Sequence, residues 1–373
     1  MNKAIKYRVY PSDEQAVMFA KTFGCCRKVY NLMLNDKLES YKTTGKFVYV
    51  TPAIYKKEYL YLKEVDSLAL ANVQLNLQKA FRNCFDKSRK KRNGFPKFKS
   101  AKHSRKSYTT NNQKGTVAII GNTIKLPKIG KVKAVIHRQP EADWTIKSAT
   151  VSQESDGAFY ISVLFEFERN IVQAAKSDNV IGLDYKSDGL YMDSNGNIGS
   201  NHKYYRESHE KLAKEQRRLS RKTGSKKNQP KSKNYLKQLK KVNKIHRHIT
   251  NQRIDNLHKL STEIANQVDA VCVESLDMKA MSNKGFGNGK ATLDNGYGIF
   301  LNMLEYKLSD RGKYFIKVDK WYPSSQLCSS CGSQKKITLA DRIYKCSCGL
   351  EIDRDYNAAI NIKNEGLRLL KAA

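Results

Sequence analysis

The sequence predicts a multidomain α+β protein, and three observations support this fold class. The chain has 373 residues, enough for two or three compact units. Hydrophobic residues make up 40% of it and aromatic residues 10%, which is too many for a disordered polypeptide. The spacing of apolar residues also changes along the chain, from helical periodicity to strand alternation and then to short buried strands between helices. We therefore expect a helical part, a β-rich part and an α/β part, in that order.

The first part begins with a strand and continues as helices. Residues 5–10 alternate in hydrophobicity and end at a proline, as a strand does. Ser12 and Gln15 form a capping box in its glutamine form, so a long helix should begin there. A second helix is expected over residues 67–87, where apolar side chains share one stripe. Residues 12–92 are therefore predicted to be a helical domain inserted after a first strand.

The second part has the pattern of a β domain. From residue 93 the chain consists of short β-branched runs separated by Gly, Pro and Asn. Such runs are typical of an antiparallel barrel or curled sheet, which the N-terminal strand could close. Residues 1–11 and 93–175 are therefore predicted to form one β domain.

The α/β part contains two short apolar runs that each end on a carboxylate. Residues 180–183 lead to Asp184, and residues 271–273 lead to Glu274. A hairpin turn is expected at Asn195-Gly196, between these runs. A carboxylate at the end of a buried strand costs several kcal/mol of desolvation unless cations compensate it.

A third acid lies just before a final helix that should begin near residue 356. Asp353 and Asp355 are both candidates, and we favour Asp355 because it would sit at the start of that helix. Asp353 would then be a loop acid paired with Arg354 or Arg342. Together with the two strand-end acids, Asp355 could hold divalent metal, and two Mg²⁺ ions held in this way support phosphodiester cleavage. The alternative is that these acids are ordinary turn and capping residues.

The charge balance indicates a nucleic-acid partner. The chain has 69 Lys and Arg against 35 Asp and Glu, a formal net charge of +34. Such a surplus repels itself unless a polyanion neutralises it, and the polyanion that best fits is nucleic acid. A small-molecule metabolic enzyme fits poorly. We expect a cytoplasmic or nucleoid-associated protein, because no apolar leader or membrane-length run is present.

Two basic blocks are expected to contact the nucleic acid. Residues 86–106 carry ten Lys and Arg and one Asp, and residues 201–260 carry 19 Lys and Arg and 4 acids, or 19 − 4 = +15. Tyrosines near these blocks are suitable for stacking on bases. They are Tyr108, Tyr204, Tyr205 and Tyr235, and the basic candidates are Lys90, Lys91, Arg92, Arg217, Arg218 and Arg221. The alternative is that the blocks are solvated helix faces.

Four cysteines near the C-terminus have metal-ligand spacing. The pairs are Cys328 with Cys331 and Cys346 with Cys348, and a glycine follows each pair. Two short cysteine loops can converge on one tetrahedral Zn²⁺, which is then structural because four thiolates leave no open position. Two disulfides, unrelated thiols and an iron–sulfur cluster are the alternatives. The other four cysteines are expected to be reduced core thiols.

These motifs together resemble the TnpB family of transposon-encoded RNA-guided endonucleases, which is related to the type V CRISPR effectors. The resembling stretches run through nearly the whole chain in the family's order, from YRVYPSDEQ and FPKFKS through IGLDYKSDGLYMDSNG and VCVESLDMKAM to WYPSSQLCSSCG and CSCGLEIDRDYNAAINI. The resemblance places the family's three catalytic acids on Asp184, Glu274 and Asp355. In the family the second cysteine pair is usually C-x-x-C, whereas this chain has C-x-C.

The resemblance also implies a domain plan and a set of partners. The plan is a wedge β-barrel (1–11 and 93–175), a helical recognition domain (12–92), a RuvC-type, ribonuclease-H-like nuclease domain (176–320 and 351–373) and a zinc-binding segment (321–350). The partners are a guide RNA and target double-stranded DNA, and a monomeric protein is favoured. Asn72, Asn76, Lys79 and Asn83 share a flank of the predicted helix 67–87 and are candidates for reading a short DNA motif. An ordinary polar helix face is the alternative.

Three functions remain open from the sequence. The favoured one is an RNA-guided DNA endonuclease that cleaves guide-matched DNA beside a short flanking motif. The second is an RNA-guided repressor without cleavage, which would be expected to have lost its carboxylates. The third is a transposase on a ribonuclease-H-like fold, for which the acid order Asp, Asp, Glu would be usual instead of Asp, Glu, Asp.

Overall fold

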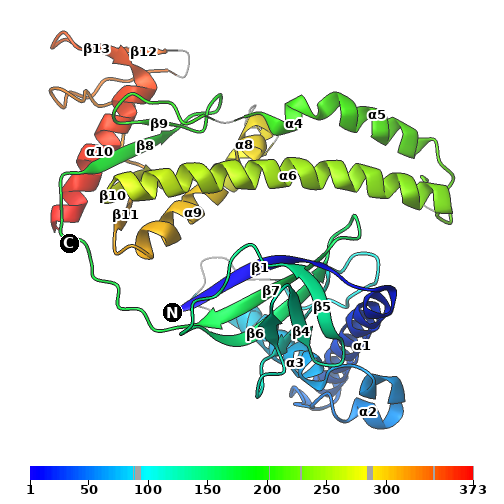
Figure 1. Ribbon diagram of the computed structural model, residues 1–373. Helices are drawn as coiled ribbons and strands as arrows, with labels where there is room; N and C mark the ends of the chain where they lie inside the picture. Colours follow the sequence, from blue (N-terminus) through cyan, green and yellow to red (C-terminus); the bar gives the residue numbers. More distant parts are fainter. Residues whose placement is uncertain are drawn as a thin grey trace. The chain divides into compact units, whose positions relative to one another are not determined.

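The computed structural model describes residues 1–86, 88, 94–200, 202–226, 229–283, 289–338 and 341–372. The predicted contacts Lys90, Lys91 and Arg92 lie outside these residues. The chain divides into two compact units, Met1–Arg169 and Asn170–Ala373 (Figure 1). Among the helices described, none is both long enough and apolar enough to cross a membrane.

The first unit contains a long helix, a second helix and a seven-stranded sheet. Its elements are β1 (Asn2–Tyr10), α1 (Asp13–Thr44), α2 (Tyr55–Glu58), a 3₁₀ helix (Leu60–Lys63), α3 (Ser67–Phe85), β2 (Lys106–Asn111), β3 (Ala118–Ile120), β4 (Thr123–Leu126), β5 (Gly130–Val135), β6 (Thr145–Gln153) and β7 (Phe159–Glu166). The expected strand and both expected helices are therefore present.

The sheet of the first unit is curled and antiparallel. Its order is β2-β6-β7-β1-β5-β4-β3, so β1 lies in the middle of the sheet. The register runs from Asn2 opposite Glu166 to Val9 opposite Phe159 on one side, and β5 pairs on the other. Within the described residues, β2 and β3 stay at the two edges. The prediction of a curled sheet is confirmed, and β1 joins its two halves and does not close a barrel.

The helices of the first unit share one hydrophobic core with this sheet. The predicted capping box at the start of α1 is present, with Ser12 Oγ accepting from the Gln15 amide at 3.3 Å. Asp66 caps α3 by accepting from two backbone amides, and its carboxylate also accepts from the Thr110 hydroxyl of β2. Apolar residues of both helices belong to the same buried cluster as those of β6 and β7. The predicted helical domain therefore packs as part of this unit.

The second unit contains a four-stranded sheet with helices on both faces. Its elements are β8 (Val180–Tyr185), β9 (Tyr191–Asp193), α4 (Tyr204–Glu207), α5 (His209–Ser220), α6 (Lys233–Gln267), β10 (Ala270–Glu274), α7 (Met278–Met281), α8 (Gly289–Asn295), α9 (Tyr297–Ser309), β11 (Tyr314–Val318), β12 (Ile343–Lys345), β13 (Glu351–Asp353) and α10 (Arg354–Ala372). The sheet order is β11-β10-β8-β9, in which the first three strands are parallel and β9 is antiparallel.

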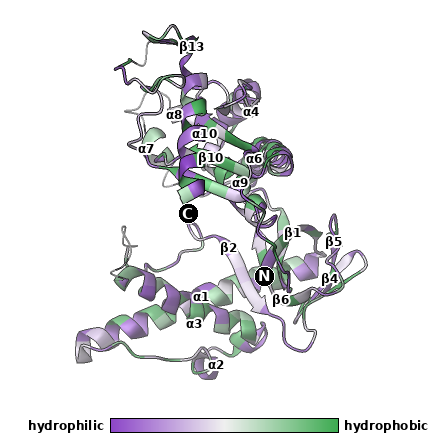
Figure 2. Cartoon of the chain, turned by 90° about the vertical axis from the view of Figure 1, so that its left-hand side faces the viewer, coloured by the Kyte–Doolittle hydropathy of each residue, from purple (hydrophilic) through white to green (hydrophobic). Residues whose placement is uncertain are grey.

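Strand alternation explains how this sheet carries a helical layer on each face. Side chains at Ile181, Leu183, Val271 and Val273 pack with α6 and α9, whereas those at Val180, Ala270 and Cys272 pack with α10. Figures 1 and 2 show α10 and the α6–α9 pair on opposite sides of β10. The strands are therefore buried on both faces, which is why they read as continuous apolar runs.

Two glycines let α10 approach the sheet closely. A Cβ atom at Gly182 of β8 would overlap the carbonyl oxygen of Ala359, and one at Gly366 of α10 would overlap the sulfur of Cys272. Because neither residue has a side chain, the backbones of β8 and α10 meet directly at Gly182, and the Cys272 side chain packs against the helix backbone at Gly366. The body of α10 is thereby held close against β8 and β10.

Candidate functional site: a carboxylate cleft and a cysteine cluster

The three predicted acids lie along one cleft of the second unit. Asp184 is the fifth residue of β8, and Glu274 is the last residue of β10. Because Leu183 is the register partner of Val273, the two acids occupy the next position on neighbouring parallel strands. By alternation they share the face of Gly182 and Cys272, which is the face that α10 covers. Asp355, in the first turn of α10, lines the same cleft.

Burial and like charge oppose ionisation at the strand-end acids. Burial raises the pKa of Asp184 well above its usual range, and the nearby charges of Asp355 and Glu274 raise it further. Burial also raises the pKa of Glu274. A cation between these carboxylates would relieve both effects, since it would replace repulsion by attraction.

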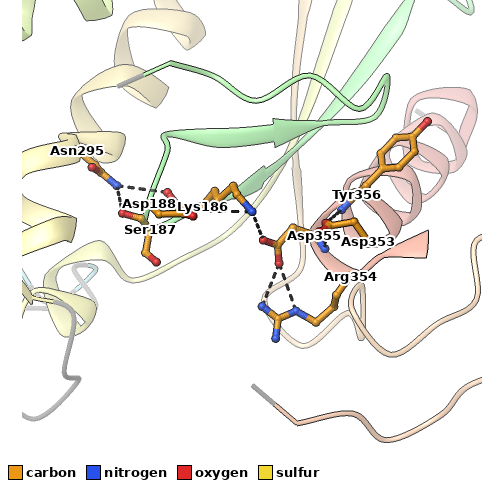
Figure 3. Close-up of polar contacts among 8 residues, drawn as sticks. All are labelled: Lys186, Ser187, Asp188, Asn295, Asp353, Arg354, Asp355 and Tyr356. Atoms are coloured by element: carbon orange, nitrogen blue, oxygen red, sulfur yellow. Dashed lines mark hydrogen bonds and ion pairs between the residues drawn. The ribbon is translucent and has the colours of Figure 1, made fainter. Parts of the chain in front are cut away.

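Asp355 is held by two cations of the chain itself (Figure 3). Lys186 Nζ lies 2.8 Å from one of its carboxylate oxygens, and Arg354 Nη2 lies 3.0 Å from the other. Although burial opposes ionisation, these hydrogen bonds and charges lower the pKa of Asp355 below its usual range. All three side chains are only 13–14% exposed, so solvent screens these pairs less than it screens a surface ion pair.

The loop that carries Lys186 is fixed from α8, a contact that the sequence did not predict. Asn295, which is 2% exposed, donates to the carbonyl oxygens of Lys186 at 3.3 Å and Ser187 at 3.0 Å (Figure 3). The Tyr185 hydroxyl lies 3.2 Å from the Thr292 hydroxyl of the same helix. These residues are more than 100 positions apart in the chain, and no local pattern marks the pairing.

Asp353 has a different role from the one predicted. It caps α10, because its Oδ1 accepts from the backbone amides of Asp355 at 2.9 Å and Tyr356 at 3.0 Å. The helix therefore begins at Arg354, two residues before the predicted start at 356. The prediction that Arg354 would pair with Asp353 is wrong, since Arg354 pairs with Asp355.

The four predicted cysteines converge on one point. Their sulfur atoms all lie within 4.8 Å of one another, with 3.6 Å between Cys328 and Cys348 and 3.6 Å between Cys331 and Cys346. A tetrahedral Zn²⁺ with bonds of about 2.3 Å would require sulfur–sulfur distances of about 3.8 Å. The donor set and its spacing therefore suit a tetrahedral thiophilic ion. In the part of the chain that the structure describes, this is the only cluster of three or more His, Cys, Asp or Glu that meets the same distance.

Each cysteine pair lies in a tight turn that ends on a left-handed glycine. Gly332 has φ 75° and donates to the Cys328 carbonyl at 2.9 Å, and Gly349 has φ 93° and donates to the Cys346 carbonyl at 3.1 Å. This is a conformation that L side chains rarely adopt, so glycine is needed at both positions. A hydrogen bond with Ser333 is the largest of the effects that lower the pKa of Cys331 to about 6. Although the second pair has the shorter C-x-C spacing, its two sulfur atoms still meet those of the first pair.

Two buried asparagines of α10 join the cysteine segment to the carboxylate cleft. Asn357 donates to the Leu327 carbonyl at 2.7 Å and accepts from the Ser329 amide at 3.0 Å. Asn361, one helical turn later, donates to the carbonyl oxygens of Ser324 and Leu327, both at 2.8 Å. The same helical turn that carries Asp355 thus fixes the first cysteine loop.

The predicted nucleic-acid residues have mixed outcomes. Asn72 and Asn76 of α3 line a polar cleft together with Lys99 and Arg105, and Lys79 is exposed outside it. Asn72 also donates to the Asn111 side chain at 3.4 Å, which ties α3 to β2. Arg217 and Arg218 of α5 and Arg221 at its end are exposed, and Arg218 pairs with Glu215 at 2.7 Å. The prediction for Tyr108 is wrong, because this residue of β2 is buried against Phe19 and Phe23 of α1.

Three family models match parts of this chain. The model described as "Probable transposase" matches residues 161–285, "Cas12f1-like, TNB domain" matches 297–362, and "Helix-turn-helix domain" matches 1–46. In the structure, residues 1–46 form β1 and the single helix α1, so this stretch contains no helix-turn-helix of its own.

The chain is similar to proteins of several organisms, to two of them over nearly all of its length and to a third over about a third of it. A Streptomyces pristinaespiralis protein named "Putative RNA-guided DNA endonuclease" is 34% identical, covering 98% of this chain and 90% of that protein. The Escherichia coli K12 protein "Putative RNA-guided DNA endonuclease InsQ" is 29% identical, covering 99% and 93%. The mimivirus "TnpB-like protein L79" is 34% identical over 35% of this chain and 27% of that protein.

The fold is also similar to a solved structure. A chain in "Cryo-EM structure of the Cas12f1-sgRNA-target DNA complex" superimposes with a TM-score of 0.62, covering 98% of this chain and 99% of that one. The two are 15% identical, so this likeness concerns the fold alone. Because the sequence identity to the Streptomyces protein is 34% over nearly the full length of both proteins, this chain belongs to the TnpB family of IS605-type elements.

Proposed function

We propose that this chain is an RNA-guided DNA endonuclease of an insertion-sequence element. It would bind a guide RNA derived from its element's end and cleave complementary double-stranded DNA beside a short flanking motif. The observation that supports this most strongly is the cleft in which Asp184 and Glu274, from neighbouring parallel strands, lie beside Asp355 of α10. All three acids are intact in a chain of the TnpB family.

The second unit would supply the nuclease. Its sheet, with α10 on one face and α6 and α9 on the other, suits a RuvC-type, ribonuclease-H-like domain built from residues 176–320 and 351–373. Residues 321–350 would be a zinc-binding insertion that lies, along the chain, between β11 and α10. In the first unit, residues 1–11 and 93–175 would form the wedge domain, and residues 12–92 the recognition domain.

The three acids would hold the catalytic metal. Mg²⁺, when bound, activates water and stabilises the leaving oxygen of a phosphodiester, and two ions held by shared carboxylates do both. Hard oxygen donors such as Asp184, Glu274 and Asp355 suit that ion, and burial raises the pKa of the first two, an effect that a bound cation would offset. Lys186 and Arg354 would keep the Asp355 carboxylate ionised, so that it could bind a metal ion. Both cations would also contact a nearby phosphate.

The cysteine cluster would hold a structural Zn²⁺. Four thiolates fill a tetrahedral shell and leave no position for water or substrate, so this site would shape the protein and not carry out chemistry. Its hydrogen bonds to Asn357 and Asn361 make it a support for the first turns of α10. Zinc would therefore act on cleavage through the position of Asp355.

The basic surfaces would bind guide RNA and the RNA–DNA duplex. The arginines of α5 lie beside the long helix α6, and Gln238 of α6 donates to Glu215 of α5 at 2.6 Å, so the two helices form one hairpin. Contacts between such a surface and the phosphate backbone of the nucleic acid do not depend on sequence. Base pairing with the guide RNA would supply the sequence specificity. The polar cleft of Asn72 and Asn76 is our candidate for reading the flanking motif, since asparagine can pair with adenine through two hydrogen bonds.

The decisive experiment combines RNA sequencing with DNA cleavage. The protein is purified from cells that carry its element, the copurifying RNA is sequenced, and DNA matching that RNA is supplied with Mg²⁺. A discrete RNA species and guide-dependent cutting by the wild type, lost in Asp184→Ala, support the proposal. RNA binding without cutting by the wild type would favour a repressor, and absence of a discrete RNA would favour a transposase.

A further inference from the structure

Trp321 lies at the carboxylate cleft and is unusually exposed. Its exposed fraction is 79%, the largest among the Phe, Tyr and Trp residues in the described parts of the chain. It lines the same cleft as Asp184, Glu274 and Asp355. Single exposed aromatic side chains are common on protein surfaces, so exposure alone assigns no role. What distinguishes this one is its place beside three acids and the rigidity of the turn that carries it.

The turn that carries Trp321 is fixed at both ends. The Trp321 amide donates to the Asp319 carboxylate at 2.8 Å, and the Tyr322 amide donates to the Asp319 carbonyl at 3.1 Å. Just before this turn β11 ends at Val318, the register partner of Glu274. Just after it the Ser324 carbonyl accepts from Asn361 of α10 at 2.8 Å. The backbone that carries the indole is therefore anchored to β10, which carries Glu274, and to α10, which carries Asp355.

The surroundings of the indole suit a nucleotide. Lys320 Nζ lies 4.4 Å from the centroid of the Trp321 ring, so a cation covers one ring face and the high exposure leaves room at the other. Lys320 and Arg354 line the cleft as well, which places positive charge for a phosphate next to an aromatic face for a base. A base inside a duplex is already stacked on both neighbours, so an unpaired base is the better partner for such a face.

We propose that Trp321 is a stacking platform that holds an unpaired base of the DNA strand whose phosphate lies at the three acids. The inference rests on the nuclease function proposed above and adds a positioning residue to it. Trp321 does not contact the reacting atoms. It would fix the strand through its base, so that the neighbouring phosphate stays at the carboxylates during cutting.

Tryptophan fluorescence tests the stacking directly. The chain has two tryptophans, and the other, Trp144, stacks on Phe167 in the first unit with ring centroids 4.4 Å apart. Trp144→Phe therefore leaves Trp321 as the one tryptophan emitter. We expect an oligothymidylate of eight nucleotides to quench this emission in the guide-RNA complex, whereas an abasic strand of equal length and charge leaves it unchanged. Binding of each strand is followed separately by anisotropy of an end label.

Three fluorescence outcomes would overturn the proposal. The first is that the oligothymidylate binds without quenching, or does not bind. The second is that the abasic strand quenches equally, which would indicate an effect of charge. The third is that loading the guide RNA already quenches Trp321 completely, which would make RNA its partner.

Cleavage by substituted proteins tests the positioning. Trp321→Ala should slow single-turnover cutting of matched DNA by about 5- to 100-fold, the range expected for loss of one base–aromatic stack, and Trp321→Phe should restore most of the rate. Tyr306→Ala is the matched control, because Tyr306 on α9 is 45% exposed and does not line the cleft. Bound zinc is measured in every variant to exclude misfolding.

The two proposals fail in different ways. If Trp321→Ala cuts at the wild-type rate and binds the oligothymidylate normally, stacking is wrong and the nuclease function stands. If the wild-type complex does not cut matched DNA, the nuclease function is wrong, and the fluorescence titration still decides whether Trp321 stacks on unpaired DNA.

Discussion

The cysteine cluster and the carboxylate cleft differ in how far their ligand atoms are already assembled. The four sulfur atoms meet within 4.8 Å, near the spacing of a tetrahedral zinc site. The three carboxylates, in contrast, come from β8, β10 and α10, and Asp355 is turned to Lys186 and Arg354. One site is complete in its ligands, and the other has neutralised part of its own charge with cations of the chain.

The difference follows from how each site is built. Each cysteine pair sits in one tight turn closed by a glycine, so local backbone geometry brings the sulfur atoms together. The acids must be brought together by the sheet and by α10, and this places Asp184 where burial, followed by the like charges of Asp355 and Glu274, raises its pKa. We infer that the first site would retain a bound metal ion permanently, and that the second would gain metal ions together with the phosphates of a substrate.

The largest effect should come from the acid that the chain's own cations hold. Asp355→Ala removes one of three carboxylates and should lower guided DNA cleavage on the order of 1,000-fold or more, because a two-metal site loses a shared ligand. Guide-RNA affinity should stay within about twofold, since the basic surfaces are unaltered. Single-turnover cleavage and a filter-binding titration measure the two quantities. Equal loss of RNA binding and cleavage would instead indicate a folding defect.

The next largest effect should come from the cysteine cluster, and it tests whether that cluster influences the carboxylate cleft. Cys331→Ser should lower the bound zinc from one equivalent to near zero, because three thiolates and a hydroxyl hold the ion far more weakly. We expect cleavage to fall as well, through the loss of order at the start of α10. Metal analysis and cleavage are measured side by side, with Cys84→Ser as the control, since Cys84 of α3 lies outside the cluster. Full cleavage without zinc would refute the support role.

A smaller effect should come from the link between the two sites. Asn357→Ala leaves the Ser329 amide without its acceptor, whereas the Leu327 carbonyl keeps Asn361 as a donor. Leaving this part-buried amide without an acceptor should cost about 1 kcal/mol, and the loss should appear as a lower unfolding midpoint and faster zinc release to a chelator. Asn364→Ala is the control, because Asn364 is exposed on the same helix. Unchanged zinc release would show that the cluster does not depend on this link.

The sequence predicted the parts of both sites that depend on local pattern. The apolar runs before Asp184 and Glu274 are readable because a strand buried on both faces has no polar positions, and the cysteine spacing is readable because each pair closes a short turn. The pairing of Lys186 with Asp355 joins residues 169 apart, and no periodicity marks it. Tyr108 shows a second limit, because alternation assigns it to one face of β2 without revealing that α1 and α3 cover that face.

The smallest effect should come from Asp353, the acid two residues before Asp355. Asp353→Ala removes the side chain that accepts from the amides of Asp355 and Tyr356, and loss of such a cap costs about 1 kcal/mol. Cutting should continue at a reduced rate, because the first turn of α10 still carries Asp355 but holds it less firmly. Asp353→Ser should recover most of the stability and most of the rate, since a serine hydroxyl also caps helices. Urea unfolding and single-turnover cleavage on Asp353→Ala, Asp353→Ser and Asp355→Ala make the comparison. If Asp353→Ala abolished cutting while Asp355→Ala retained it, the third catalytic acid would be Asp353. The cleft would then have to rearrange, because Asp353 is exposed and hydrogen-bonded to the helix start in this structure.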